Sequence, residues 1–514
     1  MLRLAAYAAN RSLFIDEAAL ALSVRHRSLP GLLVRPLDYS QTAPPGYLLL
    51  LGIARRLFGE SEYSLRFPAL LAGLLSVPLF ALLARRVLPA SGAITAVALF
   101  AFGRPLVHYG GEVKPYAFDA LAAVLILALA QRLLARGTTV RAAAAAGTVG
   151  VAALLVSQAA LFLVASVAPA VLGLLLRERR TGEARRFLLL AAVPWALAAA
   201  AASLWYLRVY SPESAEYMRY FWRTGFAPLP PWSARDLLWL PLALLTFGLD
   251  PLGTLVPVLP AVLIVAGALH LRRTRPDVVV LALAPVALAL LASAARAYPF
   301  GRNDFDLVSH SGRVLLFLLP GALLLLGGGA ACWWERSRGP GRLAAAGALL
   351  LLVGSAAALS LTTFPYTRQE AREALAEVAR HRRPGEAIYV DFRSQHYFRY
   401  YAPHLGLEGG PIVHGSCHRV DAPEYLAEWD ALRPHGRVWY LMLHPSGFDR
   451  RIARAYFHLN ADQLAAVHRV EAHAFRLRLR PAPRPGAVPD SLFALPPNVT
   501  RRDAELSCLG AWKR

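Results

Sequence analysis

The sequence is almost devoid of lysine, which occurs only at Lys114 and Lys513 in 514 residues. Its formal net charge of +22 is therefore carried almost wholly by arginine. A basic protein binds nucleic acid when its charges gather on one face, but these arginines are divided among short segments between apolar runs. We therefore expect no nucleic-acid partner, and the positions of the arginines carry more information than their number.

Cysteine is also scarce. Cys332 lies beside an apolar run, and Cys417 and Cys508 lie in the polar C-terminal part. These positions match neither the ligand spacing of a zinc site nor a dense disulfide framework. In an oxidising compartment Cys417 and Cys508 could form one bridge, and two unreactive thiols are the equal alternative.

The chain has few charged residues for its length, at 17%, whereas 56% of its residues are hydrophobic. With a mean hydropathy of +0.42, it is too apolar for an ordinary soluble enzyme of this size. Residues 1–12 have no continuous apolar core, so we expect no cleavable signal peptide. The acids that follow should come after a first membrane span, which an in-frame hydrophobic segment upstream of Met1 would supply.

Apolar runs long enough to cross a bilayer recur along the chain. About 20 residues are needed to span the hydrocarbon core. The candidate spans are 65–84, 89–107, 116–134, 142–156, 159–176, 187–206, 252–269, 278–295, 314–332 and 343–361. The pattern predicts a polytopic α-helical membrane protein with about 10–11 transmembrane helices.

Arginines occupy alternate turns between these runs. They are Arg85, Arg86, Arg132, Arg136, Arg141, Arg177, Arg179, Arg180, Arg185, Arg186, Arg272, Arg273, Arg275, Arg336, Arg338 and Arg342. The positive-inside rule makes these turns cytoplasmic. The connections 108–115, 208–250 and 296–313 then face outward, together with a first loop over residues 10–64. Polar chemistry gathered at one face favours a reaction at the outer surface over transport through broken helices.

The composition changes after residue 361. Residues 368–383 have the spacing of an amphipathic helix, 387–390 and 438–443 that of buried strands, and 461–470 that of a further helix. Alternating elements predict a small α/β domain. We therefore divide the chain into a transmembrane domain, 1–361, and an extracytoplasmic α/β domain, 362–514.

Two adjacent carboxylates, Asp16 and Glu17, precede an apolar, helix-favouring run near the start of the chain. Acids at a membrane surface indicate catalysis or cation binding. The alternative is that Asp16 is the N-cap residue of a helix that begins at Glu17.

The second outward connection holds Glu112 and Lys114 just before Pro115, which suits the first turn of the next helix. An acid and a rare lysine at headgroup depth suit the binding of a lipid phosphate or a sugar. The alternative is an interfacial ion pair worth less than ~1 kcal/mol. Arg313 precedes the span 314–332, where it could bind a phosphate bidentately or extend to the headgroups, and both readings stay open.

Several short motifs occur together in one order. They are Asp16-Glu17, Pro44-Pro45-Gly46-Tyr47, Ser64-Leu65-Arg66-Phe67-Pro68-Ala69, Glu112-Val113-Lys114-Pro115-Tyr116 and Arg313-Val314-Leu315-Leu316-Phe317-Leu318-Leu319-Pro320. Over roughly residues 10–361 the chain resembles the GT-C membrane glycosyltransferases. More narrowly it resembles the bacterial branch related to protein O-mannosyltransferases and the lipid A aminoarabinose transferase.

The resemblance implies a sugar donor carried on a polyprenyl phosphate. It implies transfer with inversion to an acceptor hydroxyl of a lipid, polysaccharide or protein, at the outer face of the bacterial cytoplasmic membrane. In that scheme Asp16 is the catalytic base, and Glu17 and Glu112 assist it. The residues matched to the donor phosphate are Lys114, Arg66, Arg313 and Tyr116.

The resemblance further implies a divalent cation, Mg²⁺ or Mn²⁺, shared by Asp16 and Glu112. The family often has histidine before its two prolines, where this chain has Ala43, which removes one expected metal ligand. Two other functions are open: a flippase or transporter of lipid-linked sugars, and a non-catalytic scaffold that binds envelope polymers.

Overall fold

The computed structural model describes residues 1–514 except 211, 302–310, 421, 483–499 and 510–514. The chain forms two compact units. The membrane unit comprises Met1–Ala9, Ala43–Arg208 and Phe221–Pro365, and the tail unit comprises Asn10–Thr42, Val209–Tyr220 and Tyr366–Arg514. The division predicted after residue 361 lies close to the last junction, whereas the segments around residues 10–42 and 209–220 group with the tail.

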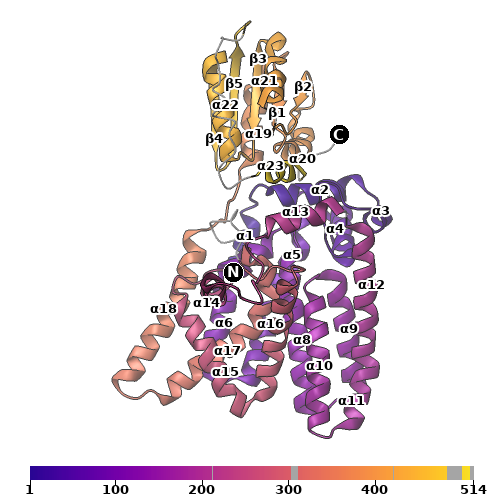
Figure 1. Cartoon of the computed structure of the whole chain (residues 1–514), viewed down its shortest axis with the longest axis vertical. Helices are drawn as coiled ribbons and strands as arrows, with labels where there is room; N and C mark the ends of the chain where they lie inside the picture. The colour runs from indigo at the N-terminus through magenta and orange to yellow at the C-terminus, as the bar shows by residue number, and fades with distance from the viewer. Residues whose placement is uncertain (211, 302–310, 421, 483–499, 510–514) are drawn as a thin grey trace. The chain divides into compact units, whose positions relative to one another are not determined.

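The membrane unit is a bundle of helices that run roughly side by side (Figure 1). Its elements are α1 (Leu2–Ala8), α4 (Pro45–Phe58), α5 (Glu62–Val87), α6 (Ala90–Phe102), α7 (Arg104–His108), η1 (Tyr109–Gly111), α8 (Tyr116–Arg136), α9 (Val140–Val156), α10 (Ala160–Arg177), α11 (Thr181–Phe187), η2 (Leu188–Ala192), α12 (Val193–Val209), α14 (Ala234–Leu249), α15 (Val258–Thr274), α16 (Pro276–Ala294), η3 (Ser311–Leu318), α17 (Leu319–Arg336) and α18 (Pro340–Thr362).

The polytopic membrane architecture predicted from the apolar runs is confirmed. Within the described residues, seven helices are long and apolar enough to cross a bilayer, or eight if the bent pair Ala90–Phe102 and Arg104–Gly111 is one span. This is fewer than the 10–11 expected because some apolar runs fold into shorter helices. Val140–Val156 has 17 residues, and the run that begins at residue 252 becomes helical only at Val258.

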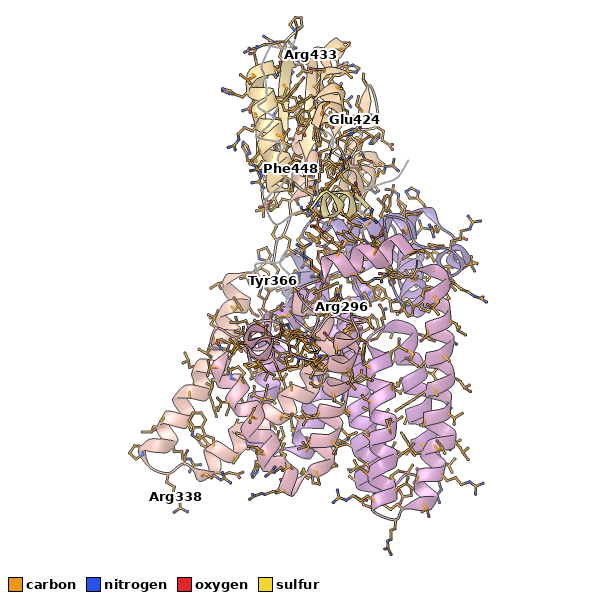
Figure 2. All side chains as sticks on the ribbon, viewed as in Figure 1. Arg296, Arg338, Tyr366, Glu424, Arg433 and Phe448 are labelled. Atoms are coloured by element: carbon orange, nitrogen blue, oxygen red, sulfur yellow. A yellow bond between two sulfur atoms is a disulfide. The ribbon has the colours of Figure 1, made fainter. Side chains whose placement is uncertain are left out.

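The turns between these helices lie at the ends of the bundle. Figure 2 shows Arg338 in the turn between α17 and α18, at the lower end of the view, and Arg296, which follows α16, toward the upper end. The two arginines belong to connections that the positive-inside rule assigns to opposite sides of the membrane. The structure places these two connections toward opposite ends of the bundle (Figure 2).

Helix α17 lies at the centre of the packing, since 94% of the most apolar 18-residue stretch within Gly312–Arg336 is buried inside the protein. Glycines allow this. A Cβ on Gly329 would lie 2.1 Å from the carbonyl oxygen of Leu263 in α15, and one on Gly92 of α6 would lie 2.2 Å from that of Gly327. Small residues let membrane helices approach backbone to backbone, so α6 and α15 both pack directly against α17.

The tail unit contains a five-stranded sheet and its covering helices (Figure 1). Its elements are α2 (Ile15–His26), α3 (Leu29–Val34), α13 (Pro212–Phe221), α19 (Ala371–His381), β1 (Ala387–Val390), α20 (Gln395–Leu405), β2 (Ile412–His414), α21 (Ala422–Asp430), η4 (Arg433–His435), β3 (Arg437–Met442), α22 (Gly447–Asn460), β4 (Ala461–Arg469), β5 (Ala472–Leu479) and α23 (Arg501–Leu509).

The sheet has the strand order β2-β1-β3-β5-β4. β1 pairs in parallel with β2 and β3, and β5 pairs antiparallel to both β3 and β4. All four residues of β1 are buried, as expected for a parallel strand covered on both faces. The predicted α/β tail domain is confirmed, including its first helix, whose buried residues are Ala371, Ala374, Leu375 and Val378.

The helix predicted over residues 461–470 is wrong, because this segment is strand β4. Its Ala, Gln and Leu favour a helix in isolation. The segment instead pairs along its length with β5, from Ala461 opposite Leu479 to Arg469 opposite Ala472. Hairpin pairing therefore overrides a helical propensity that amounts to a few tenths of a kcal/mol per residue.

The tail unit also holds the disulfide that the sequence left open. Cys417 and Cys508 are joined, with their Cα atoms 5.8 Å apart, and the bond closes a separation of 91 residues. It ties the C-terminal helix α23 to the connection that follows β2.

Candidate functional site

The start of α2 is organised by Glu17. Phe14 is the N-cap residue, and its backbone N–H donates to Oε2 of Glu17 at 2.9 Å. This is the reciprocal half of a capping box. The alternative in which Asp16 is the N-cap of a helix beginning at Glu17 is therefore wrong. Asp16 lies in the first helical turn, half-buried, whereas Glu17 is 1% exposed.

The residues just before α2 dock on other parts of the tail unit. The Leu13 N–H donates to the hydroxyl of Tyr401 at 2.8 Å. The Arg368 guanidinium lies 3.4 Å from the centre of the Phe14 ring, and His444 packs edge-on to the same ring at 5.7 Å. A cation over an aromatic face is attractive. These contacts hold the first turn of α2, and with it Asp16, in a defined position.

Two buried histidines lie within reach of the Asp16 charge. Burial lowers the pKa of His396 to about 4 and that of His444 to about 3, and the Asp16 carboxylate opposes the shift in each. Both imidazoles are therefore neutral near pH 7. Burial also raises the pKa of Tyr217, from the 209–220 segment, and Asp16 adds to that shift. Asp16 thus lies within electrostatic range of two neutral imidazoles and a buried tyrosine, and Arg393 acts on His444 and Tyr217 as well.

Further charged groups follow the parallel strands. Asp391 and Arg393 come directly after β1, and Arg419 follows β2 and binds Asp449 at 2.5 Å. Burial, and then the charge of Asp449, raises the pKa of Asp391 to about 7. Burial opposes ionisation of Asp449, but Arg419 outweighs it and the pKa of Asp449 is lowered. In α/β folds ligands bind at this carboxyl edge of the sheet, so charge has gathered where binding is expected.

In the membrane unit, Glu112 lies in the short connection between η1 and α8. Its Oε1 is 2.7 Å from Nε2 of His108, one helical turn earlier, and the two side chains are 4% and 2% exposed. An enclosed acid beside an enclosed imidazole is a pair whose partners stabilise each other in place. Sequence reasoning singled out Glu112 and missed His108, although the spacing of four residues is the signal for such a pair.

Lys114 and Tyr116 belong to the same connection and are partly exposed. Pro115 is the N-cap residue of α8, so Lys114 stands just outside the amino end of that helix. Tyr116 packs edge-on against Tyr109, with 5.0 Å between ring centres. A lysine beside a helix N-terminus, where backbone N–H groups also point outward, suits an anion.

Arg66 is 2% exposed on α5, and α5 packs directly against η1. A Cβ on Gly73 of α5 would lie 3.3 Å from the Cα of Gly110 in η1. Arg313 is half-buried, with its guanidinium 5.5 Å from the ring centre of Trp222. Of the two arginines expected to bind the donor phosphate, Arg66 is therefore buried on α5, and Arg313 stacks on Trp222 from η3.

One buried acid escaped the sequence reasoning. Asp119, on α8, is 5% exposed and accepts a hydrogen bond from Oγ of the fully buried Ser157 at 2.6 Å. The signal was present in the sequence, since an acid within an apolar run marks a functional position by default.

The structure therefore brings Glu112, Lys114 and Tyr116 together on one connection of the membrane unit, with the helix that carries Arg66 beside it. Asp16 and Glu17 belong to the tail unit, and their expected proximity to Glu112 stays a prediction. Among the described residues, no group of three or more His, Cys, Asp or Glu side chains is placed to hold a metal ion. The divalent cation between Asp16 and Glu112 also stays a prediction.

Comparison with known proteins finds a partial family match and a similar fold. The family model of dolichyl-phosphate-mannose-protein mannosyltransferases matches residues 42–206. The fold is similar to that of ArnT from Cupriavidus metallidurans bound to undecaprenyl phosphate, with a TM-score of 0.53 and 17% identity, over 92% of this chain and 96% of ArnT. The apo state of ArnT is similar over the same shares, with a TM-score of 0.51 and 16% identity.

Among curated protein sequences none matches this chain significantly. The family match lies over α4 to α12, which includes Arg66, Glu112, Lys114 and Tyr116, and the fold match extends over nearly the whole chain. The chain therefore has an ArnT-like membrane fold, and its residues 42–206 are similar to the dolichyl-phosphate-mannose-protein mannosyltransferases.

Proposed function

We propose that this protein is an inverting glycosyltransferase. It moves a sugar from a polyprenyl-phosphate donor to a hydroxyl of a lipid, polysaccharide or protein acceptor. The GT-C fold and the mannosyltransferase family match support a lipid-linked donor. The observation that carries the proposal is that Glu17 caps α2 while Asp16, in the same turn, stays half-buried beside neutral imidazoles.

Asp16 is the base in this scheme. Its carboxylate takes the proton of the acceptor hydroxyl as that oxygen attacks the anomeric carbon from the face opposite the phosphate. The new glycosidic C–O bond forms as the bond to the phosphate oxygen breaks, and the polyprenyl phosphate leaves with the electron pair. His396 and His444 are neutral at pH 7, so they do not cancel the negative charge that makes Asp16 basic.

The departing phosphate needs positive charge where its own negative charge grows. Lys114 supplies it at the amino end of α8, and Tyr116 offers a hydroxyl in the same connection. Arg66 and Arg313 are the further candidates, and a guanidinium can bind two phosphate oxygens at once.

Glu112 assists as a positioning residue. Its contact with His108 fixes the connection that carries Lys114 and Tyr116, so the cationic group is held before the donor arrives. A divalent cation, Mg²⁺ or Mn²⁺, when bound at Glu112 and Asp16, would supply further charge for the phosphate.

The reaction takes place at the outer face of the bacterial cytoplasmic membrane, with the tail unit outside. The arginine-rich turns support this orientation by the positive-inside rule. The Cys417–Cys508 disulfide supports it independently, because disulfides persist in oxidising compartments. The acceptor is then an envelope component.

The test is an assay of purified full-length protein with polyprenyl-phosphate sugars that differ in the sugar, scored for release of free polyprenyl phosphate and for transfer. We expect at least one donor to be turned over, with inverted anomeric configuration in the product. EDTA followed by Mg²⁺ or Mn²⁺ tests the cation. Transport of intact donor across liposomes without cleavage would instead establish the transporter, and failure of every donor to be cleaved or moved would favour the scaffold.

A further inference from the structure

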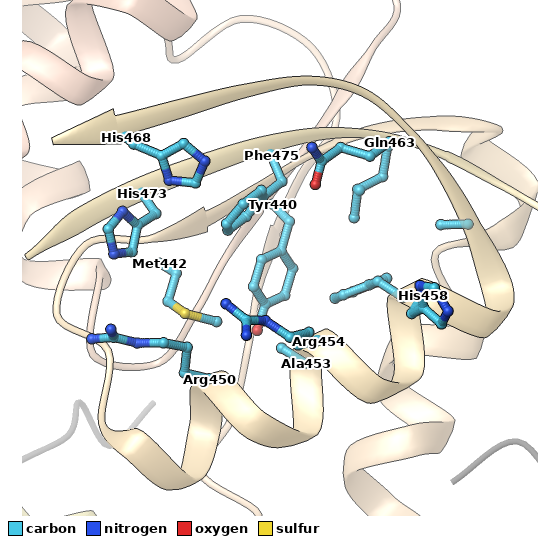
Figure 3. Close-up of a pocket in the computed structure, with 13 residues that line it drawn as sticks. Tyr440, Met442, Arg450, Ala453, Arg454, His458, Gln463, His468, His473 and Phe475 are labelled. Atoms are coloured by element: carbon cyan, nitrogen blue, oxygen red, sulfur yellow. The ribbon is translucent and has the colours of Figure 1, made fainter.

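The tail unit contains a cavity of about 550 Å³ that the proposed reaction does not use. It lies between α22 and the face of the sheet formed by β3, β5 and β4 (Figure 3). Its volume is within the range of small-molecule binding sites, roughly 300–1,000 Å³. Its lining comes from the domain fold itself rather than from a loop, so its shape is set by strand register and helix packing.

Aromatic and apolar side chains form the floor. Tyr440 of β3 is the register partner of Phe475 of β5, and Met442 is the partner of His473. Alternate residues of a strand point to one face, so these side chains share the face that α22 covers. Phe457 of α22 completes the floor, 4.8 Å from Tyr440 between ring centres. Flat ring faces of this kind suit the apolar face of a sugar ring.

The rim is basic. Arg450 and Arg454 lie one turn apart on α22, and His468 and His473 are register partners on the β4–β5 hairpin. None of the described residues that line the cavity is acidic. Arg450 donates to the exposed Glu471 at 3.2 Å, and solvent weakens an ion pair this exposed, whereas no ion pair of Arg454 is found among the described residues. The cavity therefore favours a negatively charged occupant.

Three residues that line the cavity have a buried polar atom without a hydrogen-bond partner. The Tyr440 hydroxyl is buried, with the residue 1% exposed, and within the described part of the chain it has no hydrogen-bond partner. Nδ1 of His473 and Nε of Arg450 are also buried and lack a hydrogen-bond partner among the described residues. A buried polar group without a hydrogen-bond partner destabilises the fold. A ligand that reached these atoms through small side-chain movements would supply the missing partners.

We propose that this cavity is a binding site for an anionic saccharide, a sugar that carries a phosphate or a carboxylate group. The anion is held by Arg454 with Arg450, because guanidinium groups bind phosphate and carboxylate in a two-pronged geometry. The sugar hydroxyls meet Tyr440 and His473, and the ring lies on Phe475. Burial, and then the charge of Arg450, lowers the pKa of His473, so this imidazole is neutral and can accept or donate. The site is independent of transfer at Asp16.

The test is calorimetric titration of the full-length protein in detergent with glucose 1-phosphate, glucuronic acid, inorganic phosphate and glucose. We expect binding of at least one of the two anionic sugars, at least tenfold tighter than glucose. Tighter binding of glucose 1-phosphate assigns a phosphate ligand, and tighter binding of glucuronic acid a carboxylate. Glucose binding as tightly as both anionic sugars, no binding of either, or inorganic phosphate matching glucose 1-phosphate would overturn the proposal.

Variants place the ligand in the cavity. Arg454→Gln should weaken binding of the anionic sugar at least tenfold, and Tyr440→Phe, which removes one hydroxyl and keeps the ring, several-fold. The control is Arg478→Gln. Arg478 is exposed on β5 and, by the alternation of the strand, belongs to the opposite face of the sheet, so binding should not change. Unchanged binding in both Arg454→Gln and Tyr440→Phe, each checked for an unaltered unfolding temperature, would contradict the assignment.

Discussion

In the membrane unit Glu112 is enclosed with His108 at 2.7 Å, whereas in the tail unit Asp16 is half-buried at a helix start that a neighbouring acid caps. Both carboxylates lie beside imidazoles, but only one keeps an open side. An enclosed acid can position its neighbours and cannot readily meet an acceptor. A half-exposed acid whose local structural role is taken by Glu17 can. In the mechanism proposed above, this difference in enclosure makes Glu112 the positioning acid and Asp16 the catalytic base.

Removing Glu112 should produce the largest structural effect. Glu112→Ala leaves His108 buried without its carboxylate and should destabilise the membrane unit by about 3–5 kcal/mol. The double change Glu112→Ala with His108→Ala should cost less than the two single changes together. Unfolding in detergent measures all three. Additive losses would show that the two side chains do not act as a pair, and the contrast with Asp16 would fail.

Removing the charge of Lys114 should have the next largest effect, because Glu112 positions the connection that carries Lys114. Lys114→Met should lower turnover about 10²–10³-fold, the usual loss when one stabilising group is removed from a developing charge. Lys114→Arg keeps the charge and should recover much of the rate. The measurement is release of polyprenyl phosphate under saturating acceptor. Equal losses in Met and Arg variants would show that the position needs a shape rather than a charge.

The disulfide tests the tail unit alone. Cys417→Ser with Cys508→Ser opens a closed separation of 91 residues and should destabilise the tail by about 2–4 kcal/mol. Cys332→Ser, in the membrane unit, is the matched control and should leave tail stability unchanged. Limited proteolysis of the tail, with and without reducing agent, measures the difference. An equal effect of Cys332→Ser would mean that thiol loss, and not the bridge, is responsible.

The stability of the tail unit should decrease at acid pH because its buried histidines become protonated when the chain unfolds. The pKa of His396 is about 4 in the folded chain, below its ordinary value of 6.5. Its contribution to stability is therefore complete above pH 6.5 and is lost as the pH falls toward 4, by at most about 3 kcal/mol. His396→Gln should flatten that part of the stability profile. A profile with the same acid slope in the variant would show that His396 is not the group that titrates.

Much of the architecture could be predicted from local patterns. Apolar runs and arginine-rich turns indicated the membrane helices. The predicted strand 387–390 coincides with β1, and the predicted strand 438–443 is β3 shifted by one residue. The conformation of residues 461–470 could not be predicted in this way, because it depends on pairing with β5. The surroundings of Asp16 were equally hidden. Arg368, His396 and His444 are more than 350 residues away in sequence, and no periodicity links residues at such a distance.

The most direct measurement compares Asp16→Asn with Glu17→Gln in the donor assay. Asparagine keeps the size of Asp16 and removes its basicity, so turnover should fall by at least about 10²–10⁴-fold while folding and membrane insertion persist. Glutamine can still accept the hydrogen bond from Phe14, so Glu17→Gln should keep turnover within about tenfold of the natural protein. Turnover retained in Asp16→Asn would remove Asp16 from the mechanism and contradict the account.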